Sequence, residues 1–160
     1  PDSPEYVIGE ANRRITLDTH EGLFITLFYG VLDPTSGMLL YCNAGHNPPF
    51  LLHAQGNREV HPLTRTGIPM GIVEETTWEQ RALQLSPGDM LLLYTDCVTE
   101  AQNSQKLFFE EERLLAPAQS NSGGTAQQIH DAIQTDLHEF FGGAPQFDDI
   151  TLVVLVRDSA

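Results

Sequence analysis

The chain has 160 residues, enough for one domain with a sizeable core. Eight Lys and Arg residues against 22 Asp and Glu residues give a formal net charge of −14, which disfavours nucleic-acid binding because such binding needs basic side chains that neutralise phosphates. No apolar run approaches the roughly 20 residues of a membrane-spanning helix. The only cysteines, Cys42 and Cys97, show no metal-binding or disulfide spacing, as is typical of a reducing compartment. The sequence predicts a cytoplasmic protein without membrane insertion.

The first half of the chain predicts a helix followed by a meander of strands. Ser3–Thr19 opens with a serine N-cap and a proline at the first helical position, and its apolar residues have helical spacing. The turn-forming residues 33–37 join two aromatic and β-branched stretches, which indicates a hairpin. The expected strands are Leu23–Leu32, Met38–Asn43, Phe50–His53 and Glu59–His61, with a reversal at Gln55-Gly56-Asn57.

The second half predicts more strands and two further helices. Met90–Tyr94 is apolar throughout, as expected of a strand buried on both faces. Thr125 is suited to cap a long amphipathic helix that Gly142-Gly143 would end. The other expected elements are a strand at Trp78–Leu85, a turn at 86–89, helices at Phe109–Leu115 and Ala126–Phe141, and a closing strand at Ile150–Val156. This pattern favours an α+β layered domain.

Three carboxylates stand where two buried strands end or begin. Asp96 follows the strand Met90–Tyr94, and Asp148 and Asp149 precede the strand Ile150–Val156. If these strands are antiparallel neighbours, all three side chains lie at one rim. Carboxylate oxygens suit Mg²⁺ or Mn²⁺, and a cation would offset their mutual repulsion. The alternative is that these aspartates serve only as turn and cap residues.

A series of motifs resembles one known family. The motifs, in chain order, are FITL at 24–27, LDP at 32–34, G at 37, NAGHNPP at 43–49, GIPMG at 67–71, GD at 88–89, YTD at 94–96, VTEA at 98–101 and DDIT at 148–151. Their order resembles the bacterial SpoIIE/RsbU branch of the metal-dependent (PPM, PP2C-like) serine/threonine phosphatases. The resemblance extends from the first predicted helix to the last strand.

The resemblance implies a layered αββα-type β-sandwich flanked by helices. It also implies two Mn²⁺ or Mg²⁺ ions that activate a water for attack on a phosphoserine or phosphothreonine, so that no protein nucleophile is required. By similarity, Asp96 and Asp148 are metal ligands. Asp149 is a weaker candidate, which would contact the ligands rather than the ions. Substrate-binding residues are not indicated.

Two departures from the family pattern stand out. Cys97 occupies the place of a glycine, so the turn must tolerate a Cβ or adopt a different φ, and a buried inert thiol is favoured there over a redox sensor. The aspartates of the family's leading strands have no counterpart before Leu23. We therefore expect residues 1–160 to be a single domain, the C-terminal portion of a phosphatase domain that is incomplete at its N-terminus. Such a chain would bind metal weakly, be inactive alone, and have open sheet edges that a homodimer could cover.

His46 in the AGHNPP motif is a candidate accessory proton donor, and the favoured alternative is a turn histidine bonded to backbone. The expected activity is hydrolysis of a phosphorylated signalling protein, of the type of an anti-sigma-factor antagonist. The alternative function is a non-catalytic interaction module of a partner-switching system that keeps the fold.

Overall fold

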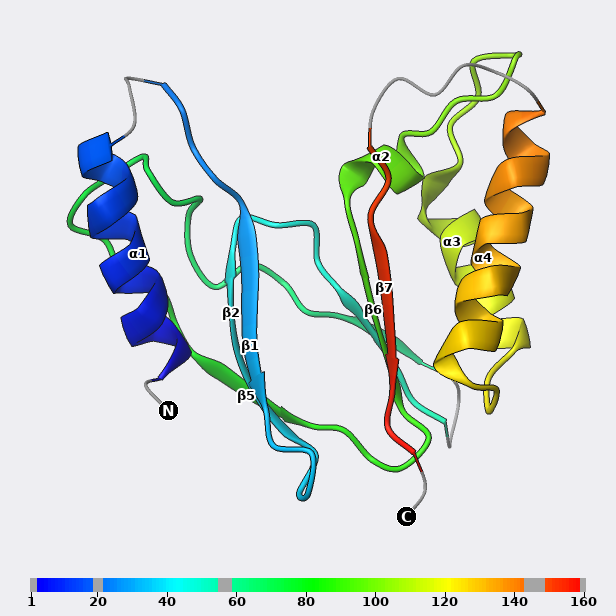
Figure 1. Cartoon of the computed structure of the whole chain (residues 1–160), viewed down its shortest axis with the longest axis horizontal. Helices are drawn as coiled ribbons and strands as arrows, with labels where there is room; N and C mark the ends of the chain where they lie inside the picture. The colour runs from blue at the N-terminus through cyan, green and yellow to red at the C-terminus, as the bar shows by residue number, and fades with distance from the viewer. Residues whose placement is uncertain (1–2, 19–21, 55–58, 143–148, 159–160) are drawn as a thin grey trace. The chain divides into compact units, whose positions relative to one another are not determined.

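The computed structural model describes residues 3–18, 22–54, 59–142 and 149–158 (Figure 1). The chain forms two compact units. The first unit comprises Pro1–Pro48 and Leu63–Leu85, and the second comprises Pro49–Pro62 and Ser86–Ala160. None of the helices in the described ranges is both long and apolar enough to cross a bilayer.

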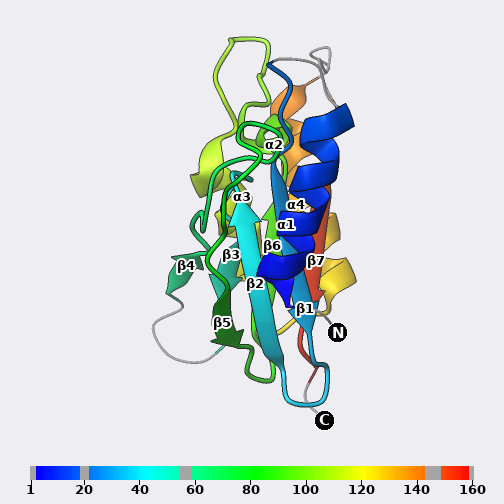
Figure 2. The ribbon, with the colours of Figure 1, turned by 90° about the vertical axis from the view of Figure 1, so that its left-hand side faces the viewer.

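The first unit contains an antiparallel sheet with a helix on one face. Its described elements are α1 (Pro4–Asp18), β1 (Leu27–Leu32), β2 (Met38–Ala44) and β5 (Arg81–Gln84), with the strand order β1-β2-β5. The predicted hairpin is confirmed, because β1 and β2 pair antiparallel. In its turn, the Asp33 carboxylate accepts from the Thr35 backbone N–H over 2.9 Å, and Gly37 takes a φ of 80°. Figure 2 shows α1 lying in front of this sheet.

The core of the first unit forms where α1 meets the sheet. Ile8 of α1 is fully buried and packs with Cys42 and Ala44 of β2 and with Met70 and Trp78. Asn12, also buried on α1, donates through Nδ2 to the carbonyls of Val73 and Glu74, and its Oδ1 accepts from the Gly71 N–H over 2.8 Å.

The glycine-rich stretch 67–71 lies close to other segments of the first unit. A Cβ on Gly67 would fall 2.2 Å from Cδ1 of Trp78, whose indole N–H donates to the Ile68 carbonyl over 2.8 Å. A Cβ on Gly45 of the AGHNPP motif would fall 2.6 Å from Cγ of Pro69. The two motifs therefore pack directly on each other within this unit.

The second unit contains an antiparallel sheet and three described helices. Its elements are β3 (Phe50–Leu52), β4 (Val60–Pro62), β6 (Met90–Tyr94), α2 (Asp96–Thr99), α3 (Glu110–Ser120), α4 (Ala126–Phe141) and β7 (Leu152–Val156), and its strand order is β4-β3-β6-β7. Thr125 and Gln128 form a reciprocal capping box at the start of α4, and Gly142 ends that helix in the left-handed conformation. Figure 1 shows α3 and α4 beside β6 and β7.

Apolar side chains from the helices and the sheet build the core of the second unit. Leu92 of β6, Phe109, Leu114 of α3, and Ile129 and Ile133 of α4 are all fully buried in one cluster. Because β6 is buried along nearly all of its length, it is the central strand that the apolar run predicts. Its position fixes where the next residue, Thr95, and then Asp96 leave the sheet.

Several predicted boundaries were wrong. β1 begins at Leu27 rather than Leu23, β5 covers only Arg81–Gln84, and α3 extends to Ser120 through an internal Pro117. The helix α2 was not predicted, because four residues are too few to show helical periodicity. The predicted reversal at 55–57 lies outside the described residues.

Candidate metal centre

The end of β6 and the start of β7 form one rim of the second unit. The two strands are antiparallel, and Tyr94 pairs with Leu152. The pairing continues one step further, because the Thr95 N–H donates to the Thr151 carbonyl over 3.1 Å and the Thr151 N–H donates to the Thr95 hydroxyl oxygen over 3.2 Å. The predicted antiparallel neighbours are thereby confirmed.

This pairing brings two of the three predicted carboxylates to the same end of the sheet. Asp96 is the residue after Thr95, and Asp149 precedes Thr151 by two residues. Both aspartates are exposed at the surface. Asp148 lies outside the described residues, so its assignment as a ligand stays a prediction.

Asp96 occupies the first position of α2, directly after the extended cap residue Thr95. Its Oδ1 accepts from the Cys97 backbone N–H over 3.0 Å, and the Cys97 Sγ lies 3.5 Å from the same oxygen. Cys97 has a helical backbone, and the positive-φ non-glycine residues of the described ranges are Lys106 and Glu110. A glycine is therefore not needed after Asp96, and the half-buried Cys97 side chain is less buried than expected.

A partly buried hydrogen bond holds the end of β6 to α3. The Tyr94 hydroxyl donates to Oε1 of Glu111 over 3.0 Å, and Tyr94 is 2% exposed. Burial raises the pKa of the Tyr94 phenol, and the Glu111 carboxylate raises it further, so the hydroxyl stays protonated as a donor. The residue two positions before Asp96 is therefore fixed on both the backbone and the side chain.

The described residues supply donors of the right chemistry for a hard cation but too few of them. Carboxylate oxygens are the ligands that Mg²⁺ and Mn²⁺ prefer. Within residues 3–18, 22–54, 59–142 and 149–158, however, His, Cys, Asp and Glu side chains form no group of three or more that could hold an ion. Asp96 and Asp149 are thus one part of a metal site at most.

His46 belongs to the first unit, and its ring is bonded locally. Its Nδ1 lies 2.9 Å from the Asn47 carbonyl oxygen, which requires the proton to be on Nδ1. This contact matches the turn alternative considered for the AGHNPP motif. The accessory proton-donor role stays untested, and the close packing of Gly45 on Pro69 gives the motif a structural purpose of its own.

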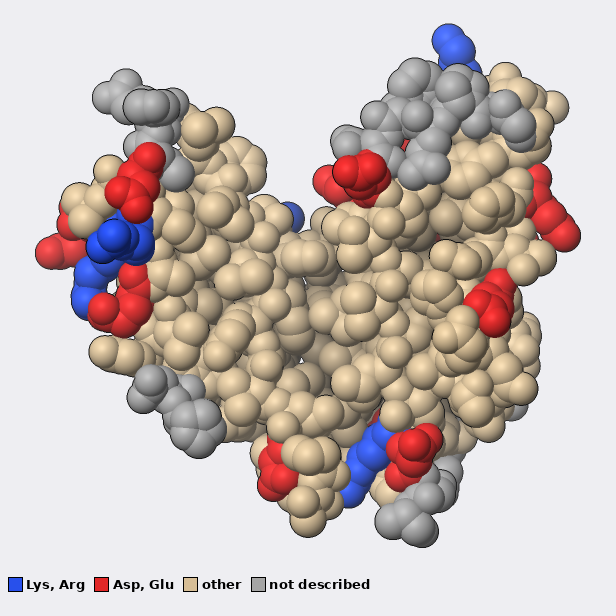
Figure 3. Space-filling model, viewed as in Figure 1, with Lys and Arg blue, Asp and Glu red and all other residues tan. Residues whose placement is uncertain are grey.

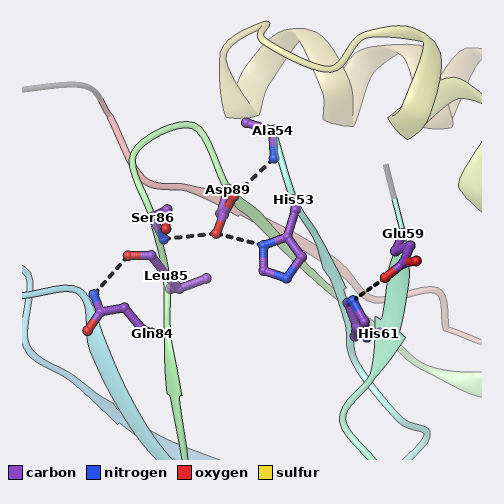
Figure 4. Close-up of polar contacts among 8 residues, drawn as sticks. All are labelled: His53, Ala54, Glu59, His61, Gln84, Leu85, Ser86 and Asp89. Carbon is purple, nitrogen blue, oxygen red and sulfur yellow. Dashed lines mark hydrogen bonds and ion pairs between the residues drawn. The ribbon is translucent and has the colours of Figure 1, made fainter. Parts of the chain in front are cut away.

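A buried carboxylate that was not predicted as a site residue is Asp89, in the turn before β6 (Figure 4). Its Oδ1 accepts from the Ala54 N–H over 3.0 Å, and its Oδ2 accepts from the Ser86 N–H over 2.8 Å and from Nδ1 of His53 over 3.0 Å. Burial by itself raises the pKa of Asp89, but the two amides and His53 outweigh burial and lower it. The expected turn at 86–89 did not reveal this network, because Ala54 and His53 are distant in sequence.

Comparison with known proteins identifies relatives along nearly the whole chain. The family described as Stage II sporulation protein E (SpoIIE) matches residues 2–158. Protein IcfG of Synechocystis sp. (strain ATCC 27184 / PCC 6803 / Kazusa) is 39% identical over 85% of this chain and 21% of its own length. Phosphoserine phosphatase RsbU of Bacillus subtilis (strain 168) is 29% identical over 96% of this chain and 45% of its own length. The chain thus spans less than half the length of either relative.

Solved structures share the fold. The SiaA-PP2C domain of Pseudomonas aeruginosa superposes with a TM-score of 0.76 at 19% identity, covering 98% of this chain and 60% of that one. The RsbU and RsbW domains of Rv1364c from Mycobacterium tuberculosis give a TM-score of 0.67 at 27% identity, covering 94% of this chain and 42% of that one. With two antiparallel sheets and their helices, these matches confirm the predicted PP2C-like α+β fold.

Proposed function

Because this chain belongs to the SpoIIE family, we propose that it is part of a metal-dependent protein serine/threonine phosphatase of the PPM type. The observation that carries the proposal is the rim at which the Thr95–Thr151 pairing brings Asp96 and Asp149 to one end of the sheet. The relative RsbU is named a phosphoserine phosphatase, which supports the same reaction. The reaction is hydrolysis of a phosphoserine or phosphothreonine in a protein.

We assign Asp96, Asp148 and Asp149 to the metal site. Bound Mn²⁺ or Mg²⁺ supplies an activated water and neutralises charge on the phosphoryl oxygens. Asp96 presents its carboxylate from a strand end that Tyr94 and Thr95 hold in place, so little ordering is left for metal binding to impose. The proposal needs no nucleophilic side chain of the chain itself.

We further propose that residues 1–160 are the C-terminal portion of a longer catalytic domain that includes further leading strands. The alignment covers 98% of this chain but only 60% of the SiaA-PP2C domain, which supports the proposal that the catalytic domain is longer than residues 1–160. Two or three carboxylates without bridging ligands bind a divalent ion weakly, so the chain alone would be inactive. In the described part of each sheet, β1 and β7 are edge strands, and a homodimer could pair them.

The proposed substrate is a phosphorylated regulator of the anti-sigma-factor-antagonist type, which places the protein in signal transduction and sigma-factor regulation. The occurrence of an RsbW domain beside an RsbU domain in Rv1364c supports a partner-switching context. We propose a cytoplasmic location, because Cys42 and Cys97, both within the described ranges, form no disulfide. The acidic composition argues against a nucleic-acid partner, and Figure 3 shows acidic side chains in small separate groups on the face in view.

The test measures phosphate release from a phosphoprotein by the full-length protein with and without Mn²⁺ or Mg²⁺. Asp96→Asn and Asp148→Asn should each lower the rate by about 100-fold or more, because the metal stabilises the transition state by several kcal/mol. Asp158→Asn is the matched control, since Asp158 is also exposed but follows the other end of β7. Undiminished activity in Asp96→Asn would show that this residue is not a ligand.

Calorimetric titration with Mn²⁺ separates the phosphatase from the non-catalytic interaction module. The phosphatase requires metal uptake that Asp96→Asn weakens. A full-length protein with neither metal uptake nor phosphate release would support the interaction module instead. The observation that favours the interaction module is the shortage of metal ligands among the described residues.

A further inference from the structure

A short hairpin between α2 and α3 projects from the second unit. The Asn103 N–H donates to the Leu107 carbonyl over 3.1 Å, and the Phe109 N–H donates to the Ala101 carbonyl over 2.9 Å. The Asn103 side-chain oxygen also accepts from the backbone N–H groups of Gln105 and Leu107, over 2.9 and 3.0 Å. These bonds fix the shape of the turn without help from other elements.

Residues 106–108, which follow the turn at Ser104 and Gln105 and are called the tip below, expose one cationic and two large apolar side chains. Leu107 is 56% exposed and Phe108 is 49% exposed, whereas the next residue, Phe109, is fully buried in the core. Lys106, which is also exposed, is the only lysine in the chain. Burying the two apolar side chains would be favourable, yet the fixed turn holds them in solvent.

The backbone of the tip is strained. Lys106 has a φ of 61°, a left-handed conformation that costs a residue with a side chain roughly 1–2 kcal/mol. Such strain persists only where surrounding bonds impose it, and it is concentrated at functional positions. In this hairpin the hydrogen bonds made by Asn103 impose it.

The hairpin lies at the same end of the second unit as the candidate metal rim. Its base, Ala101, follows Asp96 by five residues, with α2 between them. Figures 1 and 2 both show the segment between α2 and α3 extending past the end of the sheet at which α2 and the start of β7 lie. A protein whose phosphoryl group is presented to Asp96 would therefore lie at the same end of the unit as this tip.

We propose that the tip of residues 106–108 is a docking surface for the phosphoprotein substrate. This inference rests on the proposed function. The matching partner is a folded protein with an apolar patch next to its phosphoserine or phosphothreonine. Lys106 attracts the anionic phosphorylated surface, which the acidic groups Asp96, Glu100 and Glu110 would otherwise repel. Leu107 and Phe108 supply the apolar contact, preorganised so that binding orders little of the chain.

The experiment compares a phosphoprotein with a small substrate on the full-length protein in Mn²⁺. The probes are an anti-sigma-factor antagonist phosphorylated on serine and p-nitrophenyl phosphate. The double variant Leu107→Ser/Phe108→Ser should raise the KM for the phosphoprotein by about tenfold or more and leave p-nitrophenyl phosphate hydrolysis unchanged. Lys106→Glu, an independent variant, should raise the same KM by several-fold and make it less sensitive to salt.

The control is Leu23→Ser/Phe24→Ser in the first unit, which removes the same pair of residue types at similar exposure, 60% and 58%. An unchanged phosphoprotein KM in the tip variants would overturn the docking role, as would an equal rise in the control. Parallel loss of activity on both probes would also overturn it, because the tip would then support the site or the fold. An unsubstituted protein inactive on both probes would instead refute the phosphatase assignment.

Discussion

The Nδ1–H of His53 donates to Oδ2 of Asp89 over 3.0 Å, and this bond joins the residue after β3 to the residue before β6. The carboxylate is 2% exposed and also accepts from the amides of Ala54 and Ser86. Figure 4 shows the carboxylate at the centre of these three donors. The adjacent strands β3 and β6 are therefore fastened at the end opposite to the candidate metal rim.

Asp89→Asn should destabilise the protein at neutral pH by about 1–3 kcal/mol, because an amide in place of the carboxylate leaves a buried N–H donor without an acceptor. The pKa of Asp89 is lowered by folding, so its ionised form stabilises the folded state. That stabilisation is complete above the ordinary aspartate pKa of about 4 and is lost as the pH falls through the lower folded value. The difference between the two proteins in urea denaturation should therefore shrink below pH ~4.

The control for this prediction is Asp158→Asn, which changes an exposed aspartate. It should leave the free energy of unfolding within about 0.5 kcal/mol of the original value. Equal midpoints for Asp89→Asn and the unsubstituted protein at pH 7 would mean that the network around Asp89 contributes no stability.

Gly67→Ala should destabilise the first unit by about 1–3 kcal/mol, because the new Cβ would lie 2.2 Å from the Trp78 ring and one of the two must move. Gly9→Ala on α1 is the matched control, since a Cβ there has no neighbour within 4 Å. It should stabilise the helix by about 1 kcal/mol. Thermal denaturation with Trp78 fluorescence measures both changes, and a neutral Gly67→Ala would contradict the close approach.

Glu110→Gly should stabilise the protein by about 1 kcal/mol, because Glu110 opens α3 with a φ of 64° that glycine adopts freely. The control Glu112→Gly lies in the same helix without positive φ and should destabilise it by about 1 kcal/mol. Denaturant titration of the two variants gives the sign of each change. Destabilisation of similar size in both would show that position 110 carries no strain.

The sequence predicted the elements whose signal is local. The strand Met90–Tyr94 and the helix Ala126–Phe141 have the predicted bounds. An uninterrupted apolar run indicates a buried strand, and a capped amphipathic repeat indicates a helix with one buried face, without reference to distant residues. The prediction that a strand begins at Leu23 was less accurate, because β1 begins at Leu27. Residues 23–26 have strand-like composition, yet Leu23 and Phe24 are exposed, and Ile25 forms only an isolated bridge to Met70.

The candidate site was predictable in one respect only. Asp96 follows the buried strand β6, and Asp149 lies just before the half-buried strand β7, so the predicted antiparallel pairing was enough to place these two carboxylates at one end of the sheet. The Thr95–Thr151 bonds confirm that pairing. Neither the Asp89–His53 bond nor the strained turn at Lys106 has a sequence signature. Each depends on segments or hydrogen bonds that only the folded backbone brings together.

By itself, the sequence determined the family and the fold class, because the order of its motifs and the spacing of its apolar residues can be read from short stretches of the chain. The tertiary structure decided which polar groups are buried, which glycines are sterically required, and which apolar side chains remain in solvent. These outcomes depend on distances between residues far apart in sequence, such as Gly67 and Trp78, and packing sets those distances only after the strands have paired.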